Sequence, residues 1–404
     1  MRPFLAAIAV CVLALPAQAQ EKSKADHSKV LIDTATNLAT ANWKISSADW
    51  GDKNGPAWSV QLRTLHGGRQ EGVQVIEVDN GAMSFTIVPT RGFELWKAKI
   101  GVLRLGWDSP VKEIIHPSYI RLNDNEGRGW VAGFGGLMVR GGLASFGNPV
   151  QDGDQTLTLH GHVDYIPASY VSVRFESGKL IFRGVVNDFS TFGAQLQLTS
   201  EISTVIGKPE VVFDDAVANL SDAPQDMQLL YHTNFGTPLL GAGAEFIAPV
   251  RKVQPINAAS AGGLAGWNRY SGPHAAPYAA QVFNMSLHAD SAGMTKAMLK
   301  SSDGGRAVLM SFDTKGLPYM SLWKNEVTPK GGYVTGLEPG TGFPNTRPEE
   351  RAAGRVPNLK GGEVWRTHLA IAGLTSKSEV DSAASAIQKL AVAPPLIDKT
   401  TTGP

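Results

Sequence analysis

Three short segments of this chain place ionisable side chains among the turn residues that end predicted strands. They are residues 158–162 (Thr-Leu-His-Gly-His), 229–236 (Leu-Leu-Tyr-His-Thr-Asn-Phe-Gly) and 336–345 (Gly-Leu-Glu-Pro-Gly-Thr-Gly-Phe-Pro-Asn). The groups that could do chemistry are the imidazoles of His160 and His232 and the carboxylate of Glu338. Imidazoles and carboxylates are common donors and acceptors of protons in enzymes. Together the three segments indicate acid–base chemistry.

In this order, the segments resemble the aldose 1-epimerase (galactose mutarotase) family. That family has a histidine in a Leu-His-Gly-like turn, a second histidine near an Asn-Phe pair in a later strand, and a glutamate near the C-terminal end. The matching positions are His160, His232 and Glu338. The likeness is greatest to an uncharacterised branch of epimerase-like proteins and covers residues 62–373. Motifs similar to those of the branch are residues 89–92 (Pro-Thr-Arg-Gly), 106–110 (Gly-Trp-Asp-Ser-Pro), 231–236 and 336–339.

The resemblance implies an isomerase that exchanges the anomers of a free sugar or sugar acid. Interconverting α and β anomers requires the ring to open. One group removes the proton of the anomeric hydroxyl while another protonates the ring oxygen. The resemblance assigns the base to Glu338 and the acid to His232. It implies that His160 binds the ring side of the sugar and orients His232 or keeps it protonated.

The chain also departs from the well-studied mutarotases. Their Asn-Arg pair is absent, and residues 130–137 read Trp-Val-Ala-Gly-Phe-Gly-Gly-Leu instead. The aspartate with which that family binds sugar hydroxyls has no counterpart. The same scaffold occurs in lyases and hydrolases, so fold alone does not determine function. Two alternatives stay open: a lyase or other proton-transfer enzyme acting on a modified or oxidised glycoside, and a carbohydrate-binding protein without turnover.

A metal site is another interpretation of the histidines. Two histidines and a carboxylate are the ligands of a two-His, one-carboxylate centre, and His160 and His162 have ligand-like spacing. Asp164 is the one acidic residue close to them, and the epimerase-type mechanism needs no metal. We therefore expect no metal or other cofactor. His162 would share a face with His160 on a strand and contact substrate, whereas a turn at Gly161 would separate the two.

Two arginines and an asparagine are further candidates for substrate binding. Arg91 lies in a Pro-Thr-Arg-Gly turn, and its guanidinium or that of Arg140 could hold sugar hydroxyls or a carboxylate. Charge at the surface or at a sheet edge is the alternative, and it is equally good for Arg140. Asn234 lies two residues after His232 in the same motif, and we expect it to contact substrate.

The tryptophans divide by their surroundings. Trp107, Trp130 and Trp267 lie in glycine-rich segments, where a flat ring could stack on a sugar face. We expect Trp107 and Trp130 to bind substrate in this way. Trp96 and Trp365 lie inside apolar runs and are expected in the core.

The segments that must position these residues are predominantly predicted strands. Apolar and polar residues alternate over 171–176, a turn at 177–178 leads into a second strand over 179–186, and 195–200 repeats the pattern. Further strands are predicted at 211–217, 227–231, 280–287, 307–312 and 365–372. Most of the 44 glycines and 24 prolines fall between these runs. The pattern predicts an all-β protein in which two large sheets face each other. The family resemblance implies that they form a β-sandwich of the galactose mutarotase type.

One domain is predicted over residues 54–375, after a polar lead-in at 20–53. Helical periodicity is clear only near the C-terminus, where Val380, Ala384, Ile387 and Ala391 recur at helical spacing. A short helix near 376–390, followed by a tail with little structure, is therefore expected over 376–404.

The first 19 residues have the pattern of a signal peptide. Met1-Arg2 provides a positive start, residues 4–15 are apolar, and Ala17-Gln18-Ala19 matches a cleavage site. The apolar run is shorter than the roughly 20 residues that a membrane anchor needs. We expect cleavage after Ala19 and a periplasmic location.

Composition narrows the classes of partner. The single cysteine, Cys11, lies in the signal segment. The mature chain would therefore form no disulfide and contain no thiolate metal site or cysteine nucleophile. Lys and Arg number 37 against 36 for Asp and Glu, which disfavours nucleic acid or an anionic membrane as partner. A small carbohydrate is the expected ligand.

Overall fold

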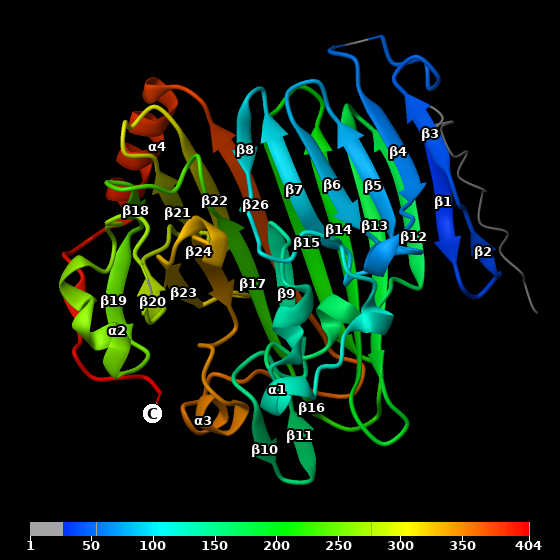
Figure 1. Cartoon of the computed structure of the whole chain (residues 1–404). Helices are drawn as coiled ribbons and strands as arrows, with labels where there is room; N and C mark the ends of the chain where they lie inside the picture. The colour runs from blue at the N-terminus through cyan, green and yellow to red at the C-terminus, as the bar shows by residue number, and fades with distance from the viewer. Residues whose placement is uncertain (1–26, 54, 276, 404) are drawn as a thin grey trace, which may run out of the picture.

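The computed structural model describes residues 27–53, 55–275 and 277–403. Two large β-sheets, one of 10 strands and one of 13, face each other (Figure 1). The two-sheet β-sandwich predicted from the sequence is therefore confirmed. The expected signal peptide, residues 1–19, lies outside the described residues.

The 10-stranded sheet is antiparallel throughout. Its order is β18 (Glu245–Ile247), β21 (Met294–Lys300), β22 (Ala307–Asp313), β26 (Val364–Leu374), β15 (Glu210–Asn219), β14 (Gln195–Val205), β13 (Lys179–Phe189), β12 (Tyr170–Glu176), β1 (His27–Asp33) and β2 (Leu38–Ala39).

The 13-stranded sheet has one parallel pairing, between β27 and β19. Its order is β27 (Leu396–Ile397), β19 (Val250–Pro255), β20 (Gln281–Leu287), β23 (Tyr319–Asn325), β24 (Val334–Gly340), β17 (Gln228–Phe235), β9 (Met138–Leu143), β7 (Glu94–Ile100), β6 (Ser84–Val88), β5 (Gln74–Asp79), β4 (Ser59–Thr64) and β3 (Trp43–Ser46), with β8 (Leu103–Leu105) beside β7. Smaller elements are α1 (Asp124–Gly127), β10 (Val150–Asp152), β11 (Gln155–Leu157), β16 (Gln225–Asp226), α2 (Ala258–Gly262), α3 (Arg347–Ala352), β25 (Asn358–Leu359) and α4 (Lys377–Leu390).

The core lies between the two sheets. Along β14 and β15, buried residues alternate with more exposed ones, as expected for strands with one face in a core. Phe85 of β6 and Phe182 of β13 meet there at 6.3 Å between ring centroids. By contrast, every residue of β17 and β24 is buried. These two strands are covered on their outer face as well, and the candidate site lies on that face.

Helix α4 confirms the predicted C-terminal helix. Ser376 caps its N-terminus, and the side chain of Glu379 bonds back to the Ser376 backbone, which completes a capping box. Val380 and Ile387 are buried beside Met298 of β21. Within the described ranges, no helix is long and apolar enough to cross a membrane.

The sandwich includes more of the chain than the sequence predicted. In the lead-in, β1 pairs with β12 and β3 pairs with β4. The tail also has structure, because β27 pairs with β19 and Asn284 donates a hydrogen bond to Thr402 Oγ1 at 2.6 Å. Strands of two to seven residues at sheet edges have too little alternation to be recognised without their partners.

Candidate active site

A cavity of about 320 Å³ opens over β17 and β24. His160, His232 and Glu338 all line it. On β17, Tyr231 points the other way, into the space between the sheets, and its hydroxyl donates to Asp215 of β15 at 2.6 Å. Because successive side chains of a strand face opposite sides, His232 projects from the outer face. The structure thus brings together three residues that are far apart in the sequence.

The register between β17 and β24 places the imidazole beside the carboxyl group. Thr233 pairs with Leu337, so His232 lies directly opposite Glu338 and the two side chains share one face. His232 Nε2 and Glu338 Oε1 are 3.2 Å apart. A Cβ atom added to Gly336 would collide with the Glu338 carboxyl group, so this glycine leaves the side chain its space.

Asn234 determines which nitrogen of His232 carries a proton. The Asn234 amide group Nδ2 donates to the carbonyl oxygens of Gly136 at 3.0 Å and of His232 at 3.1 Å. Its oxygen Oδ1 is therefore the atom that faces His232 Nδ1, at 2.7 Å. Because Oδ1 can only accept, Nδ1 must donate. In neutral His232, Nε2 then has a free lone pair on the side of Glu338.

Burial changes the protonation of the pair. It raises the pKa of Glu338 to about 8. Burial also lowers the pKa of His232 well below its usual value, and the nearby His160 lowers it further. Although Glu338 Oε1 is close to His232, the contact lacks hydrogen-bond geometry, and this buried oxygen makes no hydrogen bond to any described residue. Buried polar atoms of this kind are uncommon and require an explanation.

His160 lies in a tight turn with a backbone φ of 56°, followed by Gly161 at 70°. A positive φ is uncommon for a residue other than glycine. His160 Nδ1 bonds to the carbonyl oxygen of Phe146 at 2.8 Å, so Nδ1 is the donor. Burial lowers the pKa of His160 to about 4, and its ring centroid lies 5.4 Å from that of His232. The turn directs the two histidines of the motif apart: His162 lies outside the cavity lining and faces Asp188 at 3.6 Å.

Three aromatic side chains form the walls around His232. The ring centroids of Trp130, Phe134 and Trp323 lie 6.1, 5.0 and 5.3 Å from that of His232. Trp130 also packs edge-on against His160, at 4.6 Å. Trp130, which was expected to bind substrate, thus lines the cavity together with His160 and His232.

Arg91 lies behind the cavity wall and does not line the cavity. Its side chain is fully buried and pairs with Glu94 and Asp164, each at 3.1 Å. It also donates to the carbonyl oxygen of Gly133 at 3.0 Å, while the Tyr165 hydroxyl donates to the carbonyl oxygen of Trp130 at 2.6 Å. Arg91 was expected to contact substrate. In the structure it supports the loop that carries Trp130.

Arg140 lies between the two sheets. Its buried guanidinium pairs with Asp215 at 2.7 Å and donates to Ser200 at 2.8 Å. It also donates to the carbonyl oxygens of Gly92 and Phe93, at 3.2 and 3.1 Å. Arg140, which was expected to hold substrate, therefore does not line the cavity, and its donors are occupied within the core.

The cavity lining does not include Trp107, Trp267 or Asn234, although the sequence indicated each as a possible ligand contact. Trp107 packs behind Phe134, at 5.0 Å between centroids, and borders a neighbouring hollow. Trp267 packs against Phe246 on another part of the sandwich. Asn234 is fully buried and contacts His232 instead of lining the cavity.

Trp323 and Asn257 line the cavity but were missed from the sequence. Trp323 lies on β23 opposite Gly336, so a hairpin register of β23 with β24 would have placed it next to Glu338. Asn257 caps helix α2 by accepting from the backbone N–H of Ser260 at 3.0 Å. An asparagine before a short Ala-rich helix is a recognisable cap signal, but nothing local indicates that it faces a cavity.

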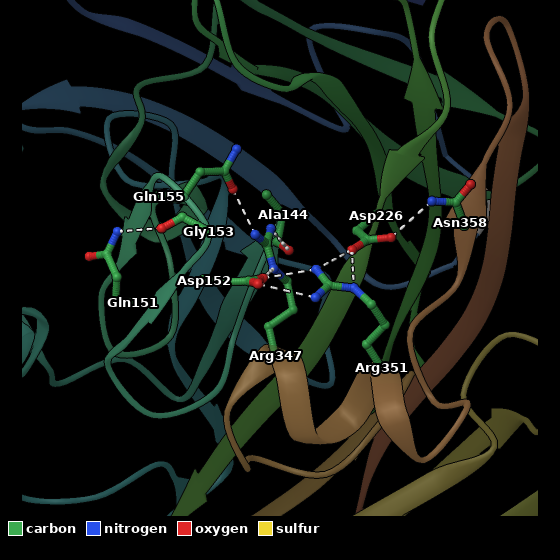
Figure 2. Close-up of polar contacts among 9 residues, drawn as sticks. All are labelled: Ala144, Gln151, Asp152, Gly153, Gln155, Asp226, Arg347, Arg351 and Asn358. Atoms are coloured by element: carbon green, nitrogen blue, oxygen red, sulfur yellow. Dashed lines mark hydrogen bonds and ion pairs between the residues drawn. The ribbon is translucent and has the colours of Figure 1, made fainter.

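An ion-pair network joins the β10–β11 hairpin, α3 and β16 (Figure 2). Asp152 of the β10–β11 hairpin contacts Arg347 and Arg351 of α3, at 2.6 and 2.8 Å, and Arg351 also reaches Asp226 of β16 at 2.6 Å. Asn148, which lies just before β10, donates to the carbonyl oxygen of Pro344, just before α3, at 3.3 Å. Both of these residues line the cavity, so this hydrogen bond joins two parts of its mouth.

Within the described ranges, no group of three or more His, Cys, Asp or Glu side chains is arranged to bind a metal ion.

Residues 70–372 match the family model described as "Domain of unknown function (DUF4432)". No curated protein sequence matches the chain significantly.

Solved structures show a stronger likeness. One is a "putative aldose 1-epimerase" from Klebsiella pneumoniae subsp. pneumoniae MGH 78578, with 35% sequence identity and a TM-score of 0.90 over 93% of this chain and 98% of that chain. A galactose mutarotase-like protein from Clostridium acetobutylicum shares 15% identity and a TM-score of 0.54 over 78% and 98% of the two chains. Galactose 1-epimerase from Lactobacillus acidophilus NCFM shares 13% identity and a TM-score of 0.51 over 78% and 99%. The last two similarities show a common fold.

Proposed function

Because this chain belongs to the DUF4432 family within the galactose mutarotase-like superfamily, we propose that it is an aldose 1-epimerase, which interconverts the anomers of a free sugar. One observation supports this above the others. Glu338 Oε1 is buried in the cavity without a hydrogen bond to any described residue, 3.2 Å from His232 Nε2. An acid and a base side by side, with unused hydrogen-bonding capacity, suit a substrate that must lose one proton and gain another.

The cavity volume fits a single sugar. At about 320 Å³ it is close to the lower end of small-molecule sites, which span roughly 300–1,000 Å³. The ring of Trp323 is partly exposed and gives a flat apolar surface on which a sugar face can stack, while the buried ring of Trp130 forms part of the cavity wall.

The mechanism depends on how many protons His232 and Glu338 carry together. Ring opening begins with Glu338 as carboxylate and His232 as imidazolium. Glu338 takes the proton of the anomeric hydroxyl, the C1–O5 bond breaks, and His232 Nε2 gives its proton to the ring oxygen. The products are an open-chain aldehyde, a neutral Glu338 and a neutral His232.

This neutral pair is the form that burial favours near pH 7, since the pKa of Glu338 is raised to about 8 and that of His232 is lowered. It is also the form that closes the ring after rotation about C1–C2, because the same steps then run backwards. Ring closure returns Glu338 to the carboxylate and His232 to the imidazolium. Before the reaction, the neutral pair reaches this form when a proton passes from Glu338 to His232 Nε2, which lies 3.2 Å from Oε1. Both forms contain one transferable proton.

His160 would act by accepting a hydrogen bond. Its Nδ1 donates to Phe146, and its low pKa of about 4 keeps Nε2 unprotonated. A bare Nε2 can accept from a sugar hydroxyl and orient the ring against the pair. Replacing His160 should therefore weaken binding as well as rate.

Proton NMR of the purified protein with free sugars and glycosides tests the proposal. Saturation transfer between the two anomeric proton signals measures exchange directly, and new signals report bond cleavage. We expect accelerated exchange of at least one reducing sugar and no cleavage of glycosides. Cleavage without anomer exchange would replace the epimerase with a lyase, and binding without either would replace it with a binding protein. Buffer without protein is the control for uncatalysed exchange.

We also propose export to the periplasm, on the basis of the signal sequence in residues 1–19. N-terminal sequencing of the protein from the envelope fraction should start at Gln20. Intact Met1 in exported protein, or a cytosolic location, would contradict this.

A further inference from the structure

The cavity is more apolar than its proton-transfer pair suggests. Besides the aromatic walls, its mouth is formed by half-buried or exposed apolar side chains, namely Val131, Leu159, Ile256, Val282 and Pro344. Val131, for example, leaves 47% of its surface exposed. Exposed apolar residues grouped around an opening indicate contact with an apolar part of a ligand.

The lining also lacks a partner for a charged ligand. Among the described residues that line the cavity there is no Lys, Arg or Asp. The guanidinium of Arg91 is held behind the wall by Glu94 and Asp164. Near pH 7 burial favours the uncharged forms of His160, His232 and Glu338, whose pKa values shift in that direction. A carboxylate or phosphate on the sugar would lose its water without gaining an opposite charge, which is strongly unfavourable.

The polar groups at the mouth are two amides. Asn257 Oδ1 accepts from the Ser260 backbone and hydroxyl groups, each at 3.0 Å, while its Nδ2 makes no hydrogen bond to any described residue. Asn148 uses its Nδ2 on Pro344. The mouth therefore offers one amide donor and one amide acceptor within an apolar rim, which suits a ligand with few hydroxyls at that end.

The depth of the reacting groups gives the ligand a direction. The side chains of His232 and Glu338 are only 7% and 4% exposed, whereas the apolar residues of the mouth are more exposed. The anomeric carbon must reach the pair, so the opposite end of the sugar lies at the mouth.

We propose that the substrate is an uncharged reducing monosaccharide with an apolar group on the end away from its anomeric carbon, and that sugar acids and sugar phosphates are rejected. A deoxy carbon, an O-alkyl group or an O-acyl group would each match the mouth. This inference rests on the proposed epimerase function.

Matched sugars test it with the purified protein. Anomer exchange is measured by saturation transfer for galactose, 6-deoxygalactose, 6-O-methylgalactose, galacturonate and galactose 6-phosphate, and in parallel for the glucose series. For at least one series, kcat/KM should be about tenfold higher for the 6-deoxy and 6-O-methyl sugars than for the parent. It should be about 100-fold or more lower for both anions than for the parent.

A charge placed at the mouth gives a second test. Val282→Lys adds a cation to the lining on β20, so the ratio of kcat/KM for galacturonate to that for 6-deoxygalactose should rise at least about tenfold. Val364→Lys is the matched control, because Val364 lies on β26 of the other sheet and is 43% exposed. The control should leave the ratio unchanged. Far-UV circular dichroism and melting temperature check that both variants fold.

The two hypotheses fail in different ways. If no reducing sugar in the panel exchanges faster than in buffer without protein, the epimerase function is wrong. If exchange is accelerated but an anionic sugar equals or exceeds its neutral parent, only the substrate class is wrong. Equal rates for the parent and its apolar derivatives, or a ratio that Val282→Lys leaves unchanged, would also overturn the substrate class.

Discussion

Asn234 Oδ1 lies 2.7 Å from His232 Nδ1, and both side chains are buried on the same strand. Because the Asn234 amide nitrogen donates to two backbone oxygens, the amide cannot turn over without losing both hydrogen bonds. Asn234 therefore holds His232 in the tautomer whose Nε2 faces Glu338. It acts through His232 and is a positioning residue.

Asn234→Asp should change the pH dependence of the reaction. A carboxylate next to Nδ1 stabilises the imidazolium, and an opposite charge at this distance shifts a pKa by about 1 to 3 units. A second proton on the pair, held by His232 while Glu338 is neutral, leaves no base. We therefore expect the loss of kcat/KM at acid pH to begin at a higher pH in this variant. Asn234→Ala is the control: it should reduce the rate without that displacement, because it removes the partner without adding charge. A normal rate and an unmoved profile for the Asp variant would rule out the positioning role.

The pH profile of the unmodified protein should be bell-shaped. The raised pKa of Glu338 is about 8. Above that pH the pair loses its one transferable proton and cannot protonate the ring oxygen. The lowered pKa of His160 is about 4. Below that pH this histidine becomes a cation and no longer accepts a hydrogen bond through Nε2. Measurement of kcat/KM across this range reports the apparent pKa values of the free protein. A flat profile from pH 6 to pH 10 would contradict the assignment of Glu338.

Glu338 should also reduce the stability of the fold at neutral and alkaline pH. An unfolded glutamate ionises near 4.3, whereas folded Glu338 keeps its proton up to about 8. Between these values the folded state binds more protons than the unfolded state, so stability falls as pH rises. Glu338→Gln has no such dependence at this position.

The corresponding measurement is the melting temperature of both proteins at pH 5, 7 and 9. The advantage of the variant should grow from pH 5 to pH 7 and change little above about 8, the pKa of the folded carboxyl group. A constant difference would show that the pKa of Glu338 is close to that of an exposed glutamate. This test is independent of activity, so it also holds if the substrate class is wrong.

Local signals explain which parts of the fold could be predicted. Helix α4 was recognised because Val380, Ala384, Ile387 and Ala391 recur at helical spacing within one short segment. Long strands such as β14 were recognised because apolar and polar residues alternate over 195–200, although the strand continues to Val205. The two-residue strands β2 and β27 have no such pattern, and their structure depends on partners distant in the sequence.

The same distinction applies to the site. His160, His232 and Glu338 were found because each lies in a recognisable motif, whereas Arg91 shows the limit of this approach. Arg91 does lie in a turn, but its buried guanidinium pairs with Asp164, 73 positions away. A buried charge needs a partner, and the sequence does not reveal which carboxylate provides it.

The C-terminal tail should contribute to the geometry of the site. Thr402 Oγ1 accepts from Asn284 Nδ2 at 2.6 Å, and Asn284 Oδ1 accepts from the Ser321 hydroxyl at 2.7 Å. Ser321 pairs across β23 and β24 with Glu338. Gly403 also donates its N–H to the carbonyl oxygen of Ile256 at 3.0 Å, next to Asn257 in the cavity lining.

Thr402→Val keeps the size of the side chain but leaves buried Asn284 without its acceptor, at a cost of about 1–3 kcal/mol. We expect a lower melting temperature and a higher KM, with a smaller change in kcat. Thr401→Val is the matched control, because Thr401 is exposed and should leave all three unchanged. If both variants behave like the unmodified protein, the tail does not support the site.

Variants of the proton-transfer pair test the assigned roles most directly. Glu338→Gln keeps the shape of the side chain but cannot accept a proton, so turnover should fall by about 10² to 10⁴ while sugar affinity changes little. His232→Asn should cause a similar loss, because the ring oxygen then lacks its acid. Each step needs both residues, so the double variant should be little slower than either single variant. Losses that multiply would instead mean that the residues act independently. His160→Asn should weaken sugar binding as well as slow turnover, whereas wild-type turnover by Glu338→Gln on the true substrate would exclude Glu338 as the base.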